Sequence, residues 1–311
     1  MSIRRATLHQ LRIFDTLARH MSITRTAEAL HLTPPAVSIQ VKQLAEAAGQ
    51  PLVEQVGKKL YFTEAGEAVA SACRDVSARM ERLSQELAAL QGLEKGTLSV
   101  SILTTAKYFV PQMLGELSER HPGIEVSLFV GNRKAILNRL AHNQDDLYIL
   151  GQPPENLSVV TIPFAPNPLV AIAHPEHPLA GKKNISPQRL AEEPFIARER
   201  GSGTRLGCEA FFERHNAAPK VRMELGSNEA IKQTVAGRLG ISIIAKITVE
   251  AEVAHGDLVI LDVKGLPLKR EWHLAYPEHN VLAPAARAFK DFLISRHKGT
   301  RAQAKATRDR N

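Results

Sequence analysis

Apolar positions near the amino terminus recur with the spacing of two short helices joined by a tight turn. The second helix would bury Val37, Val41 and Leu44, which follow one another at intervals of four and three residues. Thr33 and Pro34 predict where this helix begins, because threonine caps free amide groups and proline needs no amide partner. A first helix would run from about Ser22 to Leu30, supported by an earlier helix from about Thr7 to Arg19. The pattern predicts a helix-turn-helix.

The side of the second helix opposite this stripe carries residues suited to a DNA major groove. The candidate DNA-binding residues here are Thr33, Pro34, Pro35, Ser38, Ile39, Lys42 and Gln43. Ser38 and Gln43 offer hydrogen bonds to base edges or phosphates, and Lys42 offers a charge to a phosphate. Ile39 and Pro35 would meet thymine methyl groups. Taken alone, the pattern also fits an ordinary helical hairpin with a solvated polar face.

A short hairpin follows the helix pair. Residues 52–54 and 60–62 look like two short strands, and Lys58 and Lys59 lie at the turn between them. Lysines at the tip of such a wing would contact phosphates beside the groove. The alternative is a surface hairpin whose lysines only confer solubility.

A long helix then carries an unbroken heptad seam. Its apolar positions, spaced four and three residues apart in turn, are Val69, Cys73, Val76, Met80, Leu83, Leu87 and Leu90. A helix cannot leave such a stripe in water, so it packs either on its own chain or on a second subunit. The continuous repeat of 3.5 residues favours pairing with a second copy. Two DNA-binding domains on a shared axis would read two half-sites.

From Leu98 onward, apolar strands alternate with amphipathic helices, as in an α/β domain. Strands at 98–103, 124–130 and 147–150 flank helices at about 108–120 and 133–142. A second parallel unit would span 166–267, and residues 272–276 and 285–296 would return to the first. Two lobes joined by two crossings predict a clam-like cleft.

Ligands in such folds bind beyond the strand ends, where helix amino termini supply free amide groups. The candidate effector-binding residues follow predicted strands or begin predicted helices: Thr104, Thr105, Lys107, Asn132, Arg200, Ser202, Thr204, Arg205, Asn228 and Lys232. Hydroxyls, amides and cations in these loops predict a small anionic ligand. The alternative for each loop is a capped helix and a tight turn with no ligand.

The charge of the chain is concentrated at its two ends. The formal net charge is +8; residues 1–63 hold eight basic and four acidic residues, and residues 296–311 hold six basic and one acidic. A basic amino-terminal domain suits a polyanion such as DNA. The basic end lacks apolar periodicity and is expected to be disordered. No signal peptide or membrane span is recognisable and only two cysteines occur, so we expect a cytoplasmic protein.

Catalytic and metal-binding patterns are weak in this chain. Ser202 lies in Gly-Ser-Gly rather than a nucleophile elbow, and His174 and His177 lie in a proline-bounded loop without a third ligand. No phosphate-binding or dinucleotide fingerprint is present. We therefore expect neither an enzyme nor a resident cofactor. Cys73 lies on the heptad seam; a buried small side chain there is favoured over a redox switch.

Several motifs together resemble the LysR-type transcriptional regulators over nearly the full length of the chain. They are Ala27-Glu28-Ala29-Leu30, Pro35-Ala36-Val37-Ser38, Val41, Leu44, Leu52 and Thr63-Glu64-Ala65-Gly66. The resemblance implies a winged helix-turn-helix and an effector domain like a periplasmic solute-binding protein. Pro34 and Ile39 replace a glutamine and an arginine common in the family, as Val53 and Gln55 replace a phenylalanine and an arginine.

A narrower resemblance is to the regulators of Calvin-cycle genes, which control the RuBisCO operon. It rests on residues 49–60, Thr104 to Phe109 and Gly226 to Lys232. It implies an activator of carbon-fixation genes that responds to a phosphorylated sugar or a nicotinamide nucleotide. It also implies a dimer that pairs into a homotetramer, with RNA polymerase as a further partner.

The expected fold is an α+β multidomain chain. It comprises a winged helix-turn-helix DNA-binding domain (1–63), a coiled-coil linker helix (64–92), a two-lobed α/β effector-binding domain (93–295) and a basic disordered tail (296–311). Lobe I would hold 93–165 and 268–295, and lobe II 166–267. The protein is expected to be a transcriptional regulator that binds promoter DNA and is itself controlled by a small anionic metabolite. The alternatives are a regulator of another metabolic operon, or a cytoplasmic solute-binding or enzymatic α/β domain with a helical leader.

Overall fold

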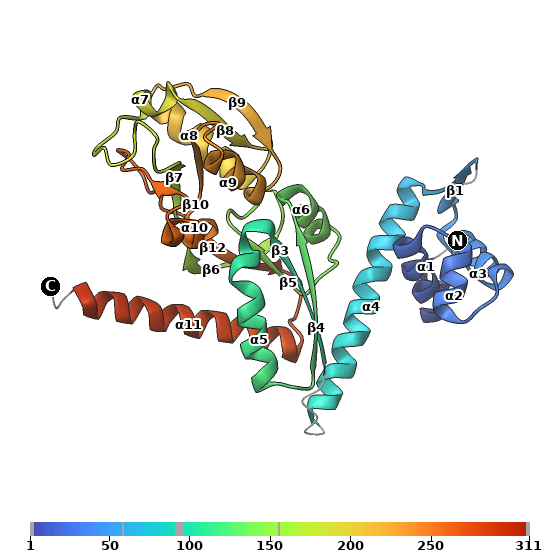
Figure 1. The fold of residues 1–311 in the computed structure, drawn as a ribbon. Helices are drawn as coiled ribbons and strands as arrows, with labels where there is room; N and C mark the ends of the chain where they lie inside the picture. Colours follow the sequence, from blue (N-terminus) through green and yellow to red (C-terminus); the bar gives the residue numbers. More distant parts are fainter. Residues whose placement is uncertain (1–2, 58, 91–95, 155, 309–311) are drawn as a thin grey trace. The chain divides into compact units, whose positions relative to one another are not determined.

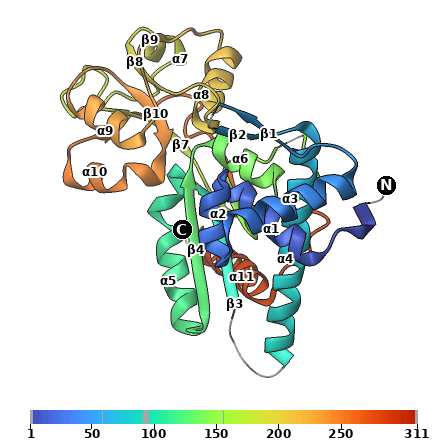
Figure 2. The ribbon, with the colours of Figure 1, turned by 90° about the vertical axis from the view of Figure 1, so that its right-hand side faces the viewer.

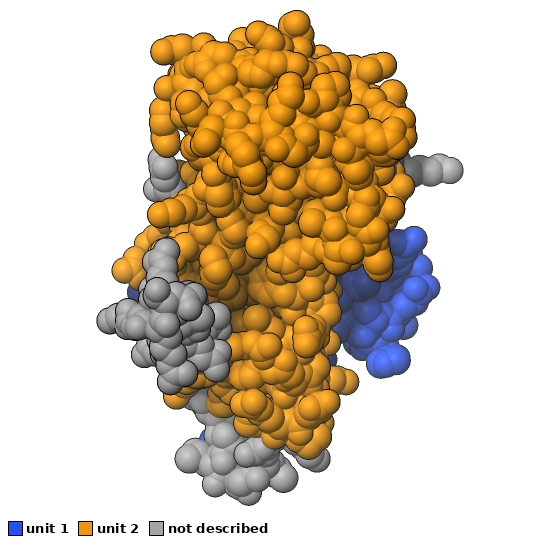
Figure 3. All heavy atoms as spheres, turned by 60° about the vertical axis from the view of Figure 1, so that its left-hand side comes forward, with its two compact units in different colours: residues 1–93, 142–144 blue, residues 94–141, 145–311 orange. Residues whose placement is uncertain are grey.

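The computed structural model describes residues 3–57, 59–90, 96–154 and 156–308 (Figure 1). The chain divides into two compact units, one of residues 1–93 with 142–144 and one of residues 94–141 with 145–311 (Figure 3). The first unit contains the predicted helix pair, and the second contains the predicted α/β lobes.

The amino-terminal unit is a helical domain with a two-stranded wing. Its elements are η1 (Ile3–Arg5), α1 (Leu8–His20), α2 (Ile23–Leu30), α3 (Pro34–Ala48), β1 (Val53–Val56), β2 (Lys59–Phe62) and α4 (Glu64–Leu90). Each of the first three α-helices begins at a hydroxyl residue, Thr7, Ser22 or Thr33, whose side chain accepts a backbone amide three residues on. Their shared core includes Phe14, Leu17, Ala27, Val37, Val41, Leu44 and Leu52. The predicted helix-turn-helix is present.

The wing is held close to the start of α4. Strands β1 and β2 pair antiparallel, with Val53 opposite Phe62 and Val56 opposite Lys59. Gly66, in the first turn of α4, passes so near the wing that a Cβ there would lie 1.9 Å from the carbonyl oxygen of Leu52. Only glycine fits this crossing without a backbone shift, so the position of the wing depends on it.

The heptad seam of α4 divides into two halves. Cys73 is buried in the amino-terminal core, with Val69 packed against that core. Further along, Met80, Leu83 and Leu87 are 46%, 41% and 53% exposed. The first half of the seam therefore packs on its own domain, and only the second half is free for another helix. The side chain of Leu90 lies outside the described residues.

Lobe I is a five-stranded sheet with strand order β4-β3-β5-β12-β6. Its elements are β3 (Gly96–Leu103), η2 (Thr104–Tyr108), α5 (Val110–Arg120), β4 (Ile124–Gly131), α6 (Arg133–Ala141), β5 (Leu147–Leu150), β6 (Val159–Pro166), β12 (Glu271–Pro277) and α11 (Pro284–Arg308). Strand β3 runs parallel to β4 and β5, whereas β12 runs antiparallel to β5 and β6. Strand β12 and helix α11 return to this lobe, as the sequence predicts.

Lobe II contains β7 (Leu169–Ala173), α7 (Pro187–Ala191), β8 (Pro194–Arg198), α8 (Gly203–Arg214), β9 (Lys220–Leu225), α9 (Asn228–Ala236), β10 (Ser242–Ala245), η3 (Lys246–Thr248), α10 (Glu250–His255) and β11 (Val259–Ile260) (Figure 2). Strands β8 and β9 are parallel, but β7 runs antiparallel to β10 and β11. The prediction of a second parallel unit is therefore wrong for β7. Apolar runs mark a buried strand without giving its direction.

The two crossings between the lobes lie side by side. The backbone amide of Asn167 donates to the carbonyl oxygen of Arg270 at 2.7 Å, and Leu169 and Leu268 form an antiparallel bridge. Residues about one hundred positions apart thus meet where the chain leaves lobe I and where it returns. These crossings form one wall of a cavity between the lobes.

The carboxyl-terminal helix is longer than the sequence predicts. Instead of a disordered tail from residue 296, α11 continues from Pro284 to Arg308. The added turns contain several alanine, lysine and arginine residues, which have high helix propensity, although the segment lacks an apolar stripe. Among the described residues, no helix is long and apolar enough to cross a membrane.

Candidate nucleic-acid interface and effector cavity

Helix α3 presents the predicted groove-facing residues to solvent. Pro35, Ser38 and Lys42 are exposed, and Ile39 is 54% exposed although it is a large apolar residue. Thr33 and Pro34 are also exposed, and the hydroxyl of Thr33 accepts the amide of Ala36 at 3.4 Å. An exposed isoleucine between polar neighbours is suited to an apolar contact with a thymine methyl group.

Two predicted DNA-binding residues, Gln43 and Lys59, lie away from the centre of this face. The side-chain amide of Gln10 on α1 donates to the Oε1 atom of Gln43 at 3.2 Å, so Gln43 faces α1. Lys59 is exposed on β2, whereas Lys58 lies outside the described residues. Tyr61, which the sequence analysis missed, lies two residues beyond Lys59 and is 44% exposed. Its neighbour Phe62 is half-buried against the core, and alternation along the strand places Tyr61 on the outer face.

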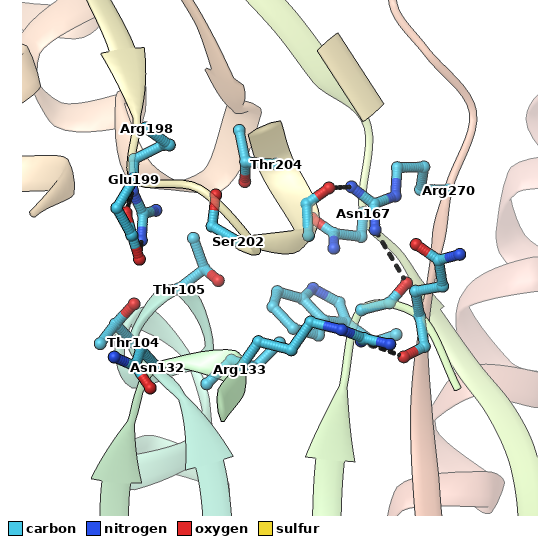
Figure 4. Close-up of a pocket in the computed structure, with 15 residues that line it drawn as sticks. Thr104, Thr105, Asn132, Arg133, Asn167, Arg198, Glu199, Ser202, Thr204 and Arg270 are labelled. Carbon is cyan, nitrogen blue, oxygen red and sulfur yellow. Dashed lines mark hydrogen bonds and ion pairs between the residues drawn. The ribbon is translucent and has the colours of Figure 1, made fainter. Parts of the chain in front are cut away.

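The effector cavity lies between the two lobes, at the carboxyl ends of the lobe I strands (Figure 4). It is lined by Leu103, Thr104, Thr105, Asn132, Arg133, Gly151, Gln152, Asn167, Arg198, Glu199, Ser202, Gly203, Thr204, Arg270 and Trp272. Its volume is about 30 Å³, which is room for one or two water molecules. Five predicted effector residues line it: Thr104, Thr105, Asn132, Ser202 and Thr204.

These five side chains come from helix starts in both lobes. Thr104 and Thr105 belong to η2, directly after β3, and Asn132 caps α6 by accepting the amide of Ala135 at 2.9 Å. Ser202 caps α8 and accepts the amide of Arg205 at 3.1 Å. Amide groups at helix amino termini favour an anion between them.

Two arginines in this cavity have no acidic partner in the part of the chain that the structure describes. Arg133 donates to the carbonyl oxygen of Gln152 at 2.5 Å, and Arg270 donates to those of Gly203 at 2.7 Å and Gly151 at 3.4 Å. Among the described residues, neither guanidinium forms an ion pair. Burial lowers the pKa of both, and the charge of Arg133 lowers the pKa of Arg270 further. An anion between them would relieve this repulsion.

Other arginines near the cavity are neutralised. Arg198, which is buried, donates to Glu199 at 2.7 Å, and Arg205 donates to Glu209 at 2.6 Å. Arg200 is exposed and does not line the cavity. Asn228 is buried behind the cavity wall, where its side-chain oxygen accepts Arg198 at 2.5 Å.

Lys107 and Lys232, which the sequence also assigned to the effector, lie outside the cavity lining. The Nζ atoms of Lys107 and Lys232 lie 3.7 Å and 3.0 Å from carboxylate oxygens of Glu229. Both lysines therefore belong to a separate charged cluster.

Three cavity residues in or beside the crossings were not predicted from the sequence: Arg270, described above, Asn167 and Trp272. The Oδ1 atom of Asn167 is buried and has no hydrogen-bond partner among the described residues, so it is available to a ligand. Trp272 is 1% exposed and packs on Phe109, with ring centroids 5.4 Å apart, forming the apolar floor. The only sequence feature that could have indicated this site is the pair Lys269-Arg270 shortly before Trp272, and it is weak.

The two cysteines are buried thiols in different units. Burial, followed by the charge of Asp15, raises the pKa of Cys73 to about 12, and burial raises the pKa of Cys208 to about 12. The reactive thiolate is therefore scarce at neutral pH, which favours a packing role for both residues. The described residues contain no group of three or more histidine, cysteine, aspartate or glutamate side chains arranged to hold a metal ion.

Comparison with known families agrees with this architecture. Residues 91–298 match the LysR substrate binding domain, and residues 8–67 match the bacterial regulatory helix-turn-helix proteins of the lysR family. The chain belongs to the LysR family. This family comprises transcriptional regulators and is not an enzyme class, and its helix-turn-helix domain implies DNA binding.

Individual LysR relatives are similar to this chain over most of its length. A RuBisCO operon transcriptional regulator from Acidithiobacillus ferrooxidans is 59% identical over 95% of this chain and 96% of its own. The transcriptional activator CmpR from Synechocystis is 48% identical over 94% of this chain and 96% of its own. The resemblance to carbon-fixation regulators noted from the sequence is confirmed.

Solved LysR structures support the fold of both units. The regulatory domain of Synechocystis CcmR, in complex with 2-PG, is 48% identical, with a TM-score of 0.64 over 66% of this chain and 98% of that chain. Full-length CbnR complexed with its target DNA has a TM-score of 0.64 at 19% identity, over 94% of this chain and 99% of that chain. At that identity the CbnR comparison bears on the fold alone.

Proposed function

We propose that this LysR regulator activates carbon-fixation genes, including a RuBisCO operon, in response to a small anion bound between its effector lobes. The observation that carries the proposal is the 59% identity to a RuBisCO operon regulator along almost the whole of both chains. The 48% identical CmpR is an activator, which supports activation rather than repression.

The proposed effector is a small anion related to 2-PG. The cavity supplies the guanidinium groups of Arg133 and Arg270, which form no ion pair within the described part of the chain, together with hydroxyls from both lobes. The CcmR regulatory domain, 48% identical over this region, binds 2-PG. A phosphorylated sugar or a nicotinamide nucleotide is the second candidate.

The proposed assembly is a dimer through α4 that pairs into a tetramer. Met80, Leu83 and Leu87 leave the second half of the seam exposed, and a second copy of α4 would cover it. Two helix-turn-helix domains would then bind two half-sites. A change in lobe closure would alter their spacing and the bend in the promoter.

Footprinting on the promoter of a carbon-fixation operon tests the proposal. The protein is expected to protect two half-sites, and 2-PG is expected to change the footprint and raise transcription with purified RNA polymerase. Parallel titrations with a sugar bisphosphate and a nicotinamide nucleotide identify the effector class. Absence of sequence-specific protection on that promoter would refute the proposed target, and protection unchanged by all three compounds would refute the proposed control.

Lys42→Ala is expected to weaken binding mainly through the salt-dependent phosphate term. The slope of log affinity against log salt should fall by about 1 for each subunit bound, because each lost phosphate contact releases one counterion fewer. Ser38→Ala should weaken binding without changing that slope, since a neutral hydroxyl carries no charge. Fluorescence anisotropy across a salt series measures both, with Lys264→Ala on lobe II as control. An unchanged slope in Lys42→Ala would contradict the phosphate contact.

A further inference from the structure

A charged cluster joins the two lobes beside the effector cavity. Its centre is Glu229 in the first turn of α9, in lobe II. The hydroxyl of Tyr108, from η2 in lobe I, donates to the Oε1 atom of this carboxylate. Lys107, also from lobe I, has its Nζ atom 3.7 Å from the same oxygen. Tyr108 and Glu229 are 121 residues apart, so this contact forms only when the lobes meet.

Lys232 holds the lobe II side of this cluster. Its side chain is 5% exposed, and its Nζ atom lies 3.0 Å from Glu229 and 2.6 Å from Glu252. The same ammonium group lies 5.3 Å from the ring centroid of Tyr108, and Lys107 lies 5.2 Å from it. The tyrosine ring is thus contacted by one cation from each lobe, an attractive arrangement for an aromatic face.

The hydrogen bond between Tyr108 and Glu229 persists near neutral pH because of the protonation states of the two groups. Burial, and then the hydrogen bond to Glu229, raises the pKa of Tyr108 to about 12, so its hydroxyl remains a donor. The hydrogen bond from Tyr108 lowers the pKa of Glu229, so this residue remains a carboxylate acceptor. A hydrogen bond to a charged acceptor is stronger than one between neutral groups.

We propose that Tyr108, Lys107, Glu229 and Lys232 form an interlobe latch that holds the effector domain closed in the absence of effector. Separation of the lobes breaks the contacts of Tyr108 and Lys107 with Glu229, whereas Lys232 keeps its partner Glu252 within lobe II. The latch sets the balance between open and closed lobes before any ligand binds.

Both sides of the latch continue into the cavity wall. Thr104 and Thr105 at the start of η2 line the cavity, and Lys107 and Tyr108 at its end form the latch. On lobe II, Asn228 accepts Arg198 of the cavity wall, and the next residue is Glu229. A ligand that shifts η2 or Arg198 would therefore also move a latch residue.

The fluorescence of Trp272 reports on the latch without any ligand. This is the one tryptophan in the chain, it lines the cavity, and it is 1% exposed. We expect Tyr108→Phe and Glu229→Gln each to raise the acrylamide quenching constant of the full-length protein about twofold or more, because the open population grows. Glu176→Gln, which removes an ion pair with Arg238 inside lobe II, serves as the control and should leave quenching unchanged.

A double variant shows whether Tyr108 and Glu229 act through the same interlobe contact or each disturb their own surroundings. Tyr108→Phe combined with Glu229→Gln should quench no more than Glu229→Gln alone, since both changes break the same contact. Lys107→Gln gives a milder variant if Tyr108→Phe fails to fold, and circular dichroism checks the fold of each. Quenching equal to wild type in every folded latch variant, or an equal rise in the control, would overturn the latch.

The affinity for 2-PG gives a second readout. Loss of the latch should strengthen 2-PG binding about tenfold, because the cavity of about 30 Å³ must widen to hold the ligand and the latch opposes that widening. If 2-PG does not bind the wild-type protein, the proposed effector fails while the quenching comparison still decides the latch.

Discussion

Arg133→Gln is expected to weaken 2-PG binding by about 30-fold, since a hydrogen bond to a charged ligand contributes about 2 kcal/mol in a desolvated site. Arg133 forms no ion pair among the described residues, so the ligand is its natural counter-charge. Arg270→Gln should have a larger effect, because Arg270 also holds the carbonyl oxygens of Gly203 and Gly151 on opposite lobes. Isothermal titration measures both changes.

The control for this experiment is Arg189→Gln, an arginine of α7 that pairs with Glu193 at 2.6 Å away from the cavity lining. Arg205→Gln removes an arginine whose charge is already balanced by Glu209, so this change should weaken 2-PG binding less than Arg133→Gln does. If binding tolerates loss of Arg133 but not of Arg205, the anion lies nearer α8 than the unpaired guanidinium groups suggest.

Leu83→Lys combined with Leu87→Lys is expected to convert the assembly to monomers and to lower operator affinity about 100-fold or more, because the two half-sites no longer bind as one ligand. Leu83 and Leu87 are 41% and 53% exposed in the single chain, so the substitutions should leave the domain fold intact. Analytical ultracentrifugation and anisotropy with a two-half-site operator measure the two effects.

Ser84→Lys provides the comparison, because residue 84 flanks the seam at a heptad position where charged residues are common. This control should remain assembled and bind operator as the wild type does. A double leucine variant that stays dimeric at low micromolar concentration would place the dimer contact elsewhere.

Local elements could be predicted from the sequence because their causes are local. Thr33, Pro34 and the spacing of Val37 and Val41 define the start and buried face of α3 within one helix. The heptad seam was less informative about its partner. Periodicity predicts that a helix face is buried, but it does not say against what. Cys73 packs on the chain's own domain, whereas Leu87 is exposed in the single chain.

The effector cavity could be predicted only in part, because it is assembled from distant segments. Thr104 and Ser202 follow strands or begin helices, and that local rule placed them at the cavity. Arg270, Asn167 and Trp272 belong to the lobe crossings, whose pairing depends on the packing of two complete lobes. The charge of Lys107 suggested a ligand contact, but its partner Glu229 was distant in sequence.

The small volume of the cavity has a consequence for timing. A metabolite needs more room than the cavity of about 30 Å³ leaves in this structure, so the walls must part for a ligand to enter. The residence time of a bound effector would then follow the rate of lobe separation rather than its diffusion through the cell. Transcription would then continue for a time after the metabolite concentration falls, so brief changes in that concentration would have little effect on expression.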